Sequence, residues 1–272
     1  MSTPRVSVLM PAYNAERYIA EAVRSILDQT FCDFQLVVVD DGSSDNSTHL
    51  VRQCAEHDPR IILIRNGSSR NICNALNRGI EEARGEYVAR MDADDWSYPD
   101  RLMQQVAFMD AHPDVVVSGG SIEICDGDLK PLNIRTYQQN DEDIRRRLFR
   151  HSPFAHPAVI YRTAAARAVG GYNPALADAE DYDFFLRLGS HGHFANLRDL
   201  LLRLRTSKDS VSQSKGRRQE HLTIYIRLKA STEYGYQMSG RDHLYTALQY
   251  ASSFMIPPRM KFWLYNRLRA RR

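Results

Sequence analysis

The sequence has few cysteines and no long apolar run. Its 272 residues include four cysteines, none of them in a C-x-x-C pair, so neither a zinc cluster nor a disulfide framework is indicated. No stretch approaches the roughly 18 apolar residues that span a bilayer, and the apolar run before Pro11 is too short for a secretory signal. We therefore expect a cytoplasmic protein, at most peripheral on the inner face of the cytoplasmic membrane. The thiols expected to be buried and reduced are Cys32, Cys54, Cys73 and Cys125.

A glycine-rich phosphate-binding turn is also absent from the start of the chain. Oxidoreductases that use a dinucleotide carry G-x-G-x-x-G after their first strand, because the backbone must approach the pyrophosphate closely. Here Pro11-Ala-Tyr-Asn14 stands in that place. The sequence therefore argues strongly against a dinucleotide-dependent oxidoreductase.

Net charge is low, but it is unevenly distributed. The chain has 36 Lys plus Arg and 33 Asp plus Glu, a net charge of +3. Residues 1–214 hold 24 basic and 30 acidic residues, whereas residues 215–272 hold 12 basic and 3 acidic residues. No nucleic-acid recognition module accompanies the basic part, so we expect no nucleic-acid partner. We predict an acidic working domain over 1–214 and a basic helical segment over 215–272.

Short apolar strands alternate with helical patterns over the first 112 residues. Four strands, each followed by a helix, predict an α/β fold with a mostly parallel central sheet flanked by helices. In such a sheet, ligands bind at the carboxyl ends of the strands. Strands are predicted at 6–10, 34–39, 60–64 and 87–91, with helices from Asn14, from Ser44 or Asp45, over 72–83 and from Pro99 to 112.

The second half of the chain is less regular. The patterns predict a strand over 115–125 that ends in a turn at 126–128, a basic helix over 141–150, a strand over 158–161 and a helix over 179–188.

The strongest chemical signal is Asp92-Ala-Asp-Asp95, which follows the fourth predicted strand. Clustered carboxylates repel one another, so a cation or hydrogen-bond donors must neutralise them. Oxygen ligands suit Mg²⁺ or Mn²⁺, and these ions commonly bridge to a diphosphate. The alternative is an acidic loop that stabilises the start of the Pro99 helix.

Polar residues also follow the first and second strands. Asp40-Asp41-Gly-Ser-Ser could accept hydrogen bonds from a ribose or a base, or could simply form a turn with a helix cap. Tyr13 offers an aromatic face for a nucleobase, or is a buried tyrosine with a satisfied hydroxyl. Because all three clusters lie at one edge of the predicted sheet, they predict a site there.

Five motifs together resemble the family 2 glycosyltransferases, which have the GT-A fold. The resemblance covers residues 5 to 212, and the order of the motifs makes it specific. The motifs are Val8-Leu-Met-Pro-Ala-Tyr-Asn14, Val38-Val-Asp-Asp-Gly-Ser-Ser-Asp45, Met91-Asp-Ala-Asp-Asp95, Gly170-Gly-Tyr-Asn-Pro174 and Ala179-Glu-Asp-Tyr-Asp183.

The resemblance implies a role for each matching residue. Tyr13 would stack near the nucleobase and Asp41 would bind it, while Asp92 would contact the ribose. Asp94 would bind the metal, supported by Asp95. Asp181 would be the general base, with Glu180 beside it. The nucleotide-binding set implied in this way is Pro11, Ala12, Tyr13, Asn14, Asp41, Arg70, Asp92 and Ala93.

The implied activity is inverting, metal-dependent transfer of a sugar from a nucleoside diphosphate donor, most often a UDP-sugar. Mn²⁺ or Mg²⁺ would serve as cofactor, and the acceptor would be a glycan or lipid-linked glycan in cell-surface polysaccharide synthesis. Displacement at an anomeric carbon needs a neutralised leaving group and a base for the acceptor hydroxyl, which this set of residues can supply. A non-catalytic nucleotide-sugar binding protein on the same fold stays open as the alternative.

Two positions depart from the family pattern. Many relatives carry an arginine where this chain has Leu76, and a histidine where it has Ser207. The second change puts a metal or phosphate contact in doubt, and Arg203, Arg205 or Lys208 are candidates to supply the positive charge instead.

Three further features have structural alternatives. His156 is expected to be structural, bonded to backbone, with a catalytic role as the alternative. The run of arginines over 145–150 is expected to form a solvated helix face, with contact to an acceptor phosphate such as a polyprenyl diphosphate as the alternative. Residues 258–272 interleave aromatic and basic residues, which is typical of a helix on an anionic membrane. Packing on the catalytic domain or a homodimer contact are the alternatives for this segment.

Overall fold

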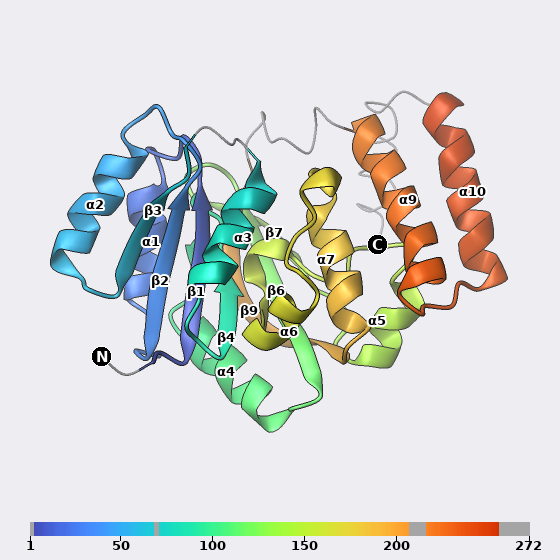
Figure 1. Cartoon of the computed structure of the whole chain (residues 1–272), viewed down its shortest axis with the longest axis horizontal. Coiled ribbons are helices and arrows are strands. Elements are labelled where there is room, and N and C mark those ends of the chain that lie inside the picture. The colour runs from blue at the N-terminus through green and yellow to red at the C-terminus, as the bar shows by residue number, and fades with distance from the viewer. Residues whose placement is uncertain (1–2, 68–70, 207–215, 256–272) are drawn as a thin grey trace.

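The computed structural model describes residues 3–67, 71–206 and 216–255. Strands and helices alternate in its first half (Figure 1). The strands are β1 (Val6–Ala12), β2 (Phe34–Asp40), β3 (Ile61–Arg65), β4 (Tyr87–Arg90), β5 (Trp96–Ser97), β6 (Val115–Cys125), β7 (Pro131–Arg135), β8 (Ile160–Arg162) and β9 (His193–Arg205). The α-helices are α1 (Ile19–Leu27), α2 (Ser47–His57), α3 (Ile72–Glu82), α4 (Arg101–Ala111), α5 (Asp141–Arg147), α6 (Thr163–Ala168), α7 (Glu180–Gly189), α9 (Gly216–Glu233) and α10 (Gly240–Met255).

The described strands form one sheet in the order β3-β2-β1-β4-β8-β6-β9-β5, with β7 paired to β6. The first four strands in this order are parallel, and every residue of β1 and β2 is buried. Burial on both faces explains why these strands read as continuous apolar runs in the sequence. Their carboxyl ends lie at one edge, where the polar residues that follow them meet.

The rest of the sheet is mixed. β8 pairs antiparallel with both β4 and β6, whereas β9 runs parallel to β6. The α/β fold with flanking helices is thus confirmed, and its parallel part is the four-stranded unit β3-β2-β1-β4.

Helices cover both faces of the sheet and bury two apolar clusters. Helices α1, α2 and α4 pack into one cluster, with β1 residues such as Val8 and Met10. Helices α3, α5, α6, α7 and α9 pack into the other, which includes Leu9. Successive β1 side chains therefore serve opposite cores, as strand geometry requires.

Most predicted elements are confirmed to within a few residues, and 115–125 is confirmed as a strand. The predicted helix start at Asn14 was wrong, and the one at Ser44 or Asp45 was one or two residues early, although the Asp45 carboxylate accepts the Ser47 N–H at 3.0 Å. Helix α1 begins five residues after Asn14, which has a positive φ of 48°, and Asn46 is the N-cap of α2. Burial was right for two thiols and wrong for two: Cys73 and Cys125 are buried, Cys54 is half-buried and Cys32 is exposed.

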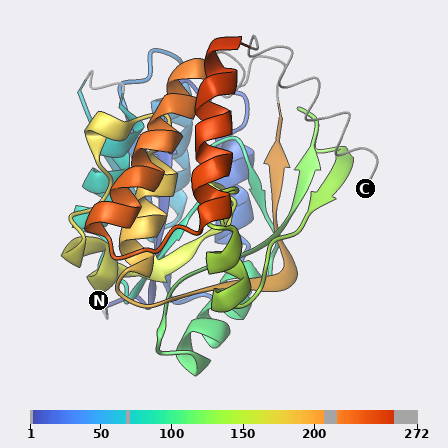
Figure 2. The ribbon, with the colours of Figure 1, turned by 90° about the vertical axis from the view of Figure 1, so that its right-hand side faces the viewer.

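The last two described helices lie side by side at one end of the molecule. Figure 2 shows α10 against α9, on the side of the chain farthest from α2. Among the helices of the described residues, none combines the length and the apolar character needed to cross a bilayer. The predicted membrane segment 258–272 lies outside the described residues.

Candidate active site

The acidic residues after β4 gather at the carboxyl edge of the sheet. One carboxylate oxygen from each of Asp92, Asp94 and Asp95 lies within 4.8 Å of the others. Asp95 is only 2% exposed and Asp92 is half-buried, whereas Asp94 is exposed. Three carboxylates this close need a compensating positive charge.

Arg90 supplies part of that charge from the last residue of β4. Its guanidinium contacts both carboxylate oxygens of Asp92, at 2.7 and 2.5 Å, in a bidentate pair. Arg90 is 2% exposed, and its carbonyl accepts a bond from Arg101 at 2.6 Å. Because Arg90 is buried in the sheet, its guanidinium has a fixed position. The bidentate pair therefore holds the Asp92 carboxylate in one orientation.

Arg205, at the end of β9, braces the acidic residues from the other side. Its guanidinium donates to the carbonyl of Asp94 at 2.6 Å, and its backbone N–H donates to the Asp95 carboxylate at 2.9 Å. The same guanidinium pairs with Glu21 of α1 and lies 4.5 Å from the Tyr18 ring centre. Three residues were candidates to supply the positive charge of the histidine that many relatives carry at position 207. Of these, Arg205 lies at the acidic residues. Arg203 pairs with Glu123 instead, and Lys208 lies outside the described residues.

The acidic residues fit a divalent cation. The second carboxylate oxygen of Asp95 is buried and has no hydrogen-bond partner. Burial, which removes water from around the carboxylate, and the nearby Asp92 charge raise the pKa of Asp94 to about 6. The same two causes, burial first, raise the pKa of Asp95 well above its usual value. A donor set of carboxylate oxygens with one buried oxygen unsatisfied suits Mg²⁺ or Mn²⁺.

The residues after β1 form one wall of the site. Pro11 and Ala12 are buried within β1, whereas the Tyr13 side chain is 46% exposed, so it is not a buried tyrosine. The Asn14 N–H donates to the Ser43 hydroxyl at 2.9 Å, and its side-chain oxygen accepts from the Ser44 N–H at 2.9 Å. Asn14 thus joins the first and second loops instead of capping a helix.

The two aspartates after β2 have different surroundings. Both Asp40 oxygens are used internally, by the Ser43 N–H at 3.1 Å and the Thr48 hydroxyl at 2.7 Å. The Asp41 N–H donates to the carbonyl of Ala12 at 2.9 Å, which places Asp41 beside the end of β1. Asp40 therefore builds the turn. Asp41, the predicted nucleotide contact, is buried, and its carboxylate accepts from the Asn66 side chain at 3.4 Å. Arg70, the predicted partner in the next loop, lies outside the described residues.

The predicted base lies in the first turn of α7. Asp181 is half-buried, and one of its oxygens accepts the Tyr182 N–H at 2.7 Å. Glu180 accepts the Asp178 N–H at 2.8 Å. Burial and the adjacent Asp181 charge raise the pKa of Glu180 to about 7.

Asp181 and the acidic residues share one electrostatic environment around Arg90. Burial raises the pKa of Asp181, and the Asp92 charge adds to that rise, while Arg90 opposes it. The charge of Arg90 also acts on Glu180, Asp94 and Asp95. Charges from the loop after β4 and from α7, which are far apart in the sequence, thus act on one another in the fold.

No sequence motif pointed to Arg90. The partner predicted for His156 was wrong. His156 is buried, as a structural residue would be, but its Nε2 bonds to the Tyr172 hydroxyl at 2.9 Å instead of to backbone. Burial and the Arg90 charge lower the pKa of His156 well below its usual value, so the ring stays neutral.

The arginine run over 145–150 is mostly paired. Arg145 binds Asp141 at 2.7 Å, Arg146 binds Glu142 at 2.5 Å, and Arg150 binds Asp242 at 2.9 Å. Arg145 also donates to the carbonyls of Gly189 and Gly192, and Arg150 binds α10, so these two arginines join helices. Arg146 pairs within α5 and is exposed, as expected for a solvated face. Within the described residues the arginines do not converge on a free anion site.

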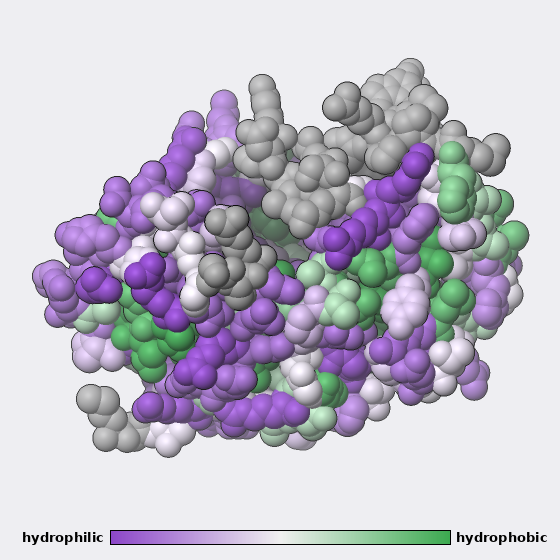
Figure 3. Space-filling model, turned by 45° about the horizontal axis from the view of Figure 1, so that its top comes forward, coloured by the Kyte–Doolittle hydropathy of each residue, from purple (hydrophilic) through white to green (hydrophobic). Residues whose placement is uncertain are grey.

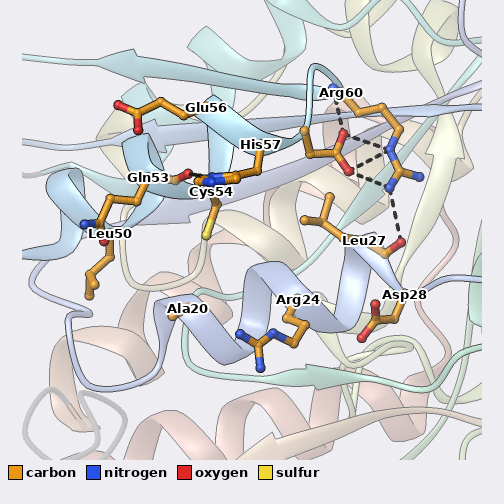
Figure 4. A pocket seen from close by; sticks show the side chains of 11 residues that line it. Ala20, Arg24, Leu27, Asp28, Leu50, Gln53, Cys54, Glu56, His57 and Arg60 are labelled. Atoms are coloured by element: carbon orange, nitrogen blue, oxygen red, sulfur yellow. Dashed lines mark hydrogen bonds and ion pairs between the residues drawn. The ribbon is translucent and has the colours of Figure 1, made fainter.

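An open pocket of about 760 Å³ lies elsewhere, between α1 and α2 (Figure 4). It contains none of the predicted site residues. One of its lining residues, Arg60, binds Asp58 at 2.7 Å and the Leu27 carbonyl at 3.2 Å. The carboxyl edge of the sheet is hollowed as well. Figure 3 looks onto that edge and shows a recess there.

Comparison with known proteins gives consistent matches. The model of glycosyl transferase family 2 matches residues 7–170. The putative glycosyltransferase EpsE of Bacillus subtilis is 34% identical over 216 residues, which cover 78% of this chain and 77% of EpsE. The amylovoran biosynthesis glycosyltransferase AmsE of Erwinia amylovora is 31% identical over 213 residues, covering 77% and 79%.

Solved structures share the fold. S. aureus TarS 1–349 in complex with UDP-GlcNAc has a TM-score of 0.67 at 23% identity, covering 85% of this chain and 68% of that one. The mannosyltransferase PcManGT of Pyrobaculum calidifontis, in complex with GDP-Man and Mn²⁺, has a TM-score of 0.67 at 20% identity, covering 94% and 71%.

Proposed function

The chain belongs to glycosyl transferase family 2 and is a glycosyltransferase, and from this premise we propose that it transfers a sugar from a nucleoside diphosphate donor to a hydroxyl of a glycan or lipid-linked glycan. The reaction would serve cell-surface polysaccharide synthesis. The observation that carries the proposal is the cluster of Asp92, Asp94 and Asp95 beside Arg90, whose charge also acts on Asp181. A site for a diphosphate and a base for an acceptor hydroxyl would then lie side by side.

The nucleoside would bind at the ends of β1 and β2. Tyr13 offers an exposed aromatic face for the base, and Asp41 lies beside it as an acceptor for a base N–H. Asp92, held by Arg90, would accept a ribose hydroxyl. Pro11, Ala12, Asn14 and Ala93 would shape the backbone around the nucleoside, and Arg70 would contact it from the next loop.

Asp94 would hold a Mn²⁺ or Mg²⁺ ion, with Asp95 supporting it. Such an ion, when bound, neutralises the charge that develops on the diphosphate leaving group. Arg205 would keep both aspartates in place through its contacts to the Asp94 carbonyl and the Asp95 carboxylate.

Asp181 would act as the general base. Its carboxylate takes the proton of the acceptor hydroxyl as that oxygen forms a bond to the anomeric carbon, and the bond from that carbon to the diphosphate breaks. A single displacement of this kind inverts the anomeric configuration. Glu180, next to Asp181, would tune the base through its own charge.

We favour a UDP-sugar as donor, and TarS, which has been solved with UDP-GlcNAc, shares the fold. The basic, aromatic residues 258–272 would add contact with the cytoplasmic face of the membrane, close to a lipid-linked acceptor.

A thermal-shift panel tests the donor site. The full chain is heated with UDP, GDP or dTDP, each with Mn²⁺ and with EDTA. We expect the largest rise in Tm with UDP and Mn²⁺, and no Mn²⁺-dependent rise in Asp94→Ala. Glu142→Gln, which removes an exposed carboxylate on α5, is the matched control and should respond like the parent chain. No stabilisation by any nucleotide would refute the proposal.

A further inference from the structure

Helix α10 has its polar and apolar faces reversed. Its buried positions recur at helical spacing and carry polar side chains, whereas its exposed positions carry large apolar ones. A helix that packs on a protein core normally presents the opposite pattern. The buried polar or half-buried polar residues of α10 are Asp242, Thr246, Gln249 and Ser253.

Hydrogen bonds and one ion pair hold three of these four residues, whereas the buried Thr246 hydroxyl has no hydrogen-bond partner among the described residues. Asp242 binds Arg150 at 2.9 Å, and Gln249 accepts from Arg227 of α9 at 2.6 Å. Ser253 and His221 of α9 are hydrogen-bonded at 2.9 Å. The orientation of α10 is therefore fixed by specific polar contacts, so its apolar face points outward by construction.

The outer face is apolar and aromatic. Leu244, Leu248 and Phe254 are each 61% exposed, and Tyr245 and Tyr250 are exposed beside them. Figure 3 shows apolar side chains gathered at the end of the molecule that carries α9 and α10. Several large apolar side chains on one helix face mark a surface that a partner covers.

Charge identifies the partner. Residues 215–272 hold 12 basic and 3 acidic residues, and the 17 residues after α10 hold six basic residues and no acidic one. A second copy on this face would bring two strongly positive segments together, which is unfavourable. An anionic lipid surface offers both an apolar interior and negative charge.

We propose that the outer face of α10, with Leu244 and Leu248 at its centre and Phe254 at its edge, where the Phe254 ring lies 5.7 Å from that of His221, docks on an anionic lipid bilayer. The proposal deepens the membrane contact suggested above for residues 258–272 and rests on it only in part, because α10 is a separate surface. Docking through α10 would set the orientation of the sheet relative to the bilayer, because hydrogen bonds hold α10 to α9.

The test measures co-sedimentation of the full chain with vesicles of phosphatidylglycerol and phosphatidylcholine, or of phosphatidylcholine alone. The variant Leu244→Gln/Leu248→Gln/Phe254→Gln changes exposed side chains only, and its Tm is measured to show that it folds. We expect binding to the anionic vesicles alone, and a fall in partitioning of about tenfold or more in the variant. Leu132→Gln/Ile134→Gln, which changes two exposed apolar residues on β7, is the matched control and should bind like the parent.

Three outcomes would overturn the proposal. One is equal vesicle binding by the α10 variant and the parent, including the case in which only deletion of 258–272 abolishes binding. Another is no binding to either vesicle. The third is a dimer in the absence of lipid, detected by light scattering, that the α10 variant converts to monomer. The thermal-shift panel with nucleotides is run on the same proteins. If vesicle binding is retained but no nucleotide stabilises the chain, the proposed glycosyl-transfer site is refuted and the α10 proposal is not.

Discussion

The buried guanidinium of Arg90 grips both carboxylate oxygens of Asp92, at 2.7 and 2.5 Å. Arg90 belongs to strand β4 of the sheet, and Asp92 belongs to the loop that would bind the nucleotide. The same guanidinium influences the protonation of Asp181 in α7. The buried Arg90 therefore stabilises the ionised carboxylates of Asp92, from the first half of the chain, and of Asp181, from the second half.

Arg90→Met should lower the free energy of unfolding by about 3 kcal/mol, because it leaves Asp92 without its partner among other carboxylates. Arg90→Lys keeps the charge but not the bidentate geometry, and should recover part of the loss. Urea unfolding measures both. In an Asp92→Asn background Arg90→Met should cost less than in the parent chain, and equal costs would show that the pair does not act as a unit.

Asp181→Asn should lower kcat for sugar transfer by about 10²- to 10⁴-fold, since the acceptor hydroxyl loses its base. Binding of UDP with Mn²⁺, followed by calorimetry, should stay close to that of the parent. A parallel loss of nucleotide binding would contradict the assignment of Asp181 as base. Glu142→Gln removes a carboxylate of an exposed pair and should leave both quantities unchanged.

The transfer rate should fall on the acid side of the pH profile, at a higher pH than an ordinary aspartate would give. A base must be ionised to act, and burial keeps the proton on Asp181 at a higher pH than on an ordinary aspartate. Because the pKa of Glu180 is about 7, its ionisation near neutral pH adds a second charge beside the base. In Glu180→Gln the acid limb of the pH–rate profile should move to lower pH. An unmoved limb would mean that the two carboxylates titrate independently.

Mn²⁺ should stabilise the chain more at pH 7 than at pH 5. The folded-state pKa of Asp94 is about 6, above its unfolded value, so the metal-free fold binds more protons and loses stability as pH rises from about 4 through 6. A cation can replace those protons. Asp95→Asn should raise Tm in EDTA at pH 7 and reduce the Mn²⁺ response. Thermal shifts with and without Mn²⁺ check this, and an undiminished Mn²⁺ response in Asp95→Asn would exclude Asp95 from the metal site.

Gly171→Ala should destabilise the fold more than Gly170→Ala, although both glycines have positive φ. An added Cβ at Gly171 would lie 2.4 Å from the side-chain oxygen of Asn77, whereas at Gly170 nothing lies within 4 Å. Asn77 also accepts the Tyr172 N–H at 2.7 Å. We expect about 1 to 2 kcal/mol for Gly170→Ala from backbone strain alone and more for Gly171→Ala. Equal losses in urea unfolding would show that Asn77 yields without cost.

The first half of the fold was predictable because its strands are buried on both faces and each ends in polar residues. The acidic residues after β4 could be placed at the sheet edge for the same reason. Strand β9 escaped prediction, since its 13 residues mix charged and apolar side chains and show no clean alternation. Its partner β6 lies almost 80 residues earlier, and a pairing of that range leaves no local signal.

Within the candidate site, the supporting residues were the hard part. Asp92, Asp94 and Asp181 stand in recognisable motifs, whereas Arg90 and Arg205 matter through contacts that only the folded chain creates. The turn residues around Asn14 misled the prediction, because asparagine suits both a helix cap and a left-handed turn. The roles of the individual site residues, and the boundary at residue 214, stay predictions.

The position of β8 between β4 and β6 bears on how the chain is synthesised. Strand β4 ends at Arg90, but its antiparallel partner begins at Ile160. At a ribosomal rate of about 5 to 20 residues per second, the edge of the parallel unit stays open for roughly 4 to 14 seconds. Nascent chains paused in that interval would present an unpaired β4 edge that can pair with another chain. Slow codons between residues 90 and 160 should therefore lower the yield of folded protein more than slow codons placed after residue 162.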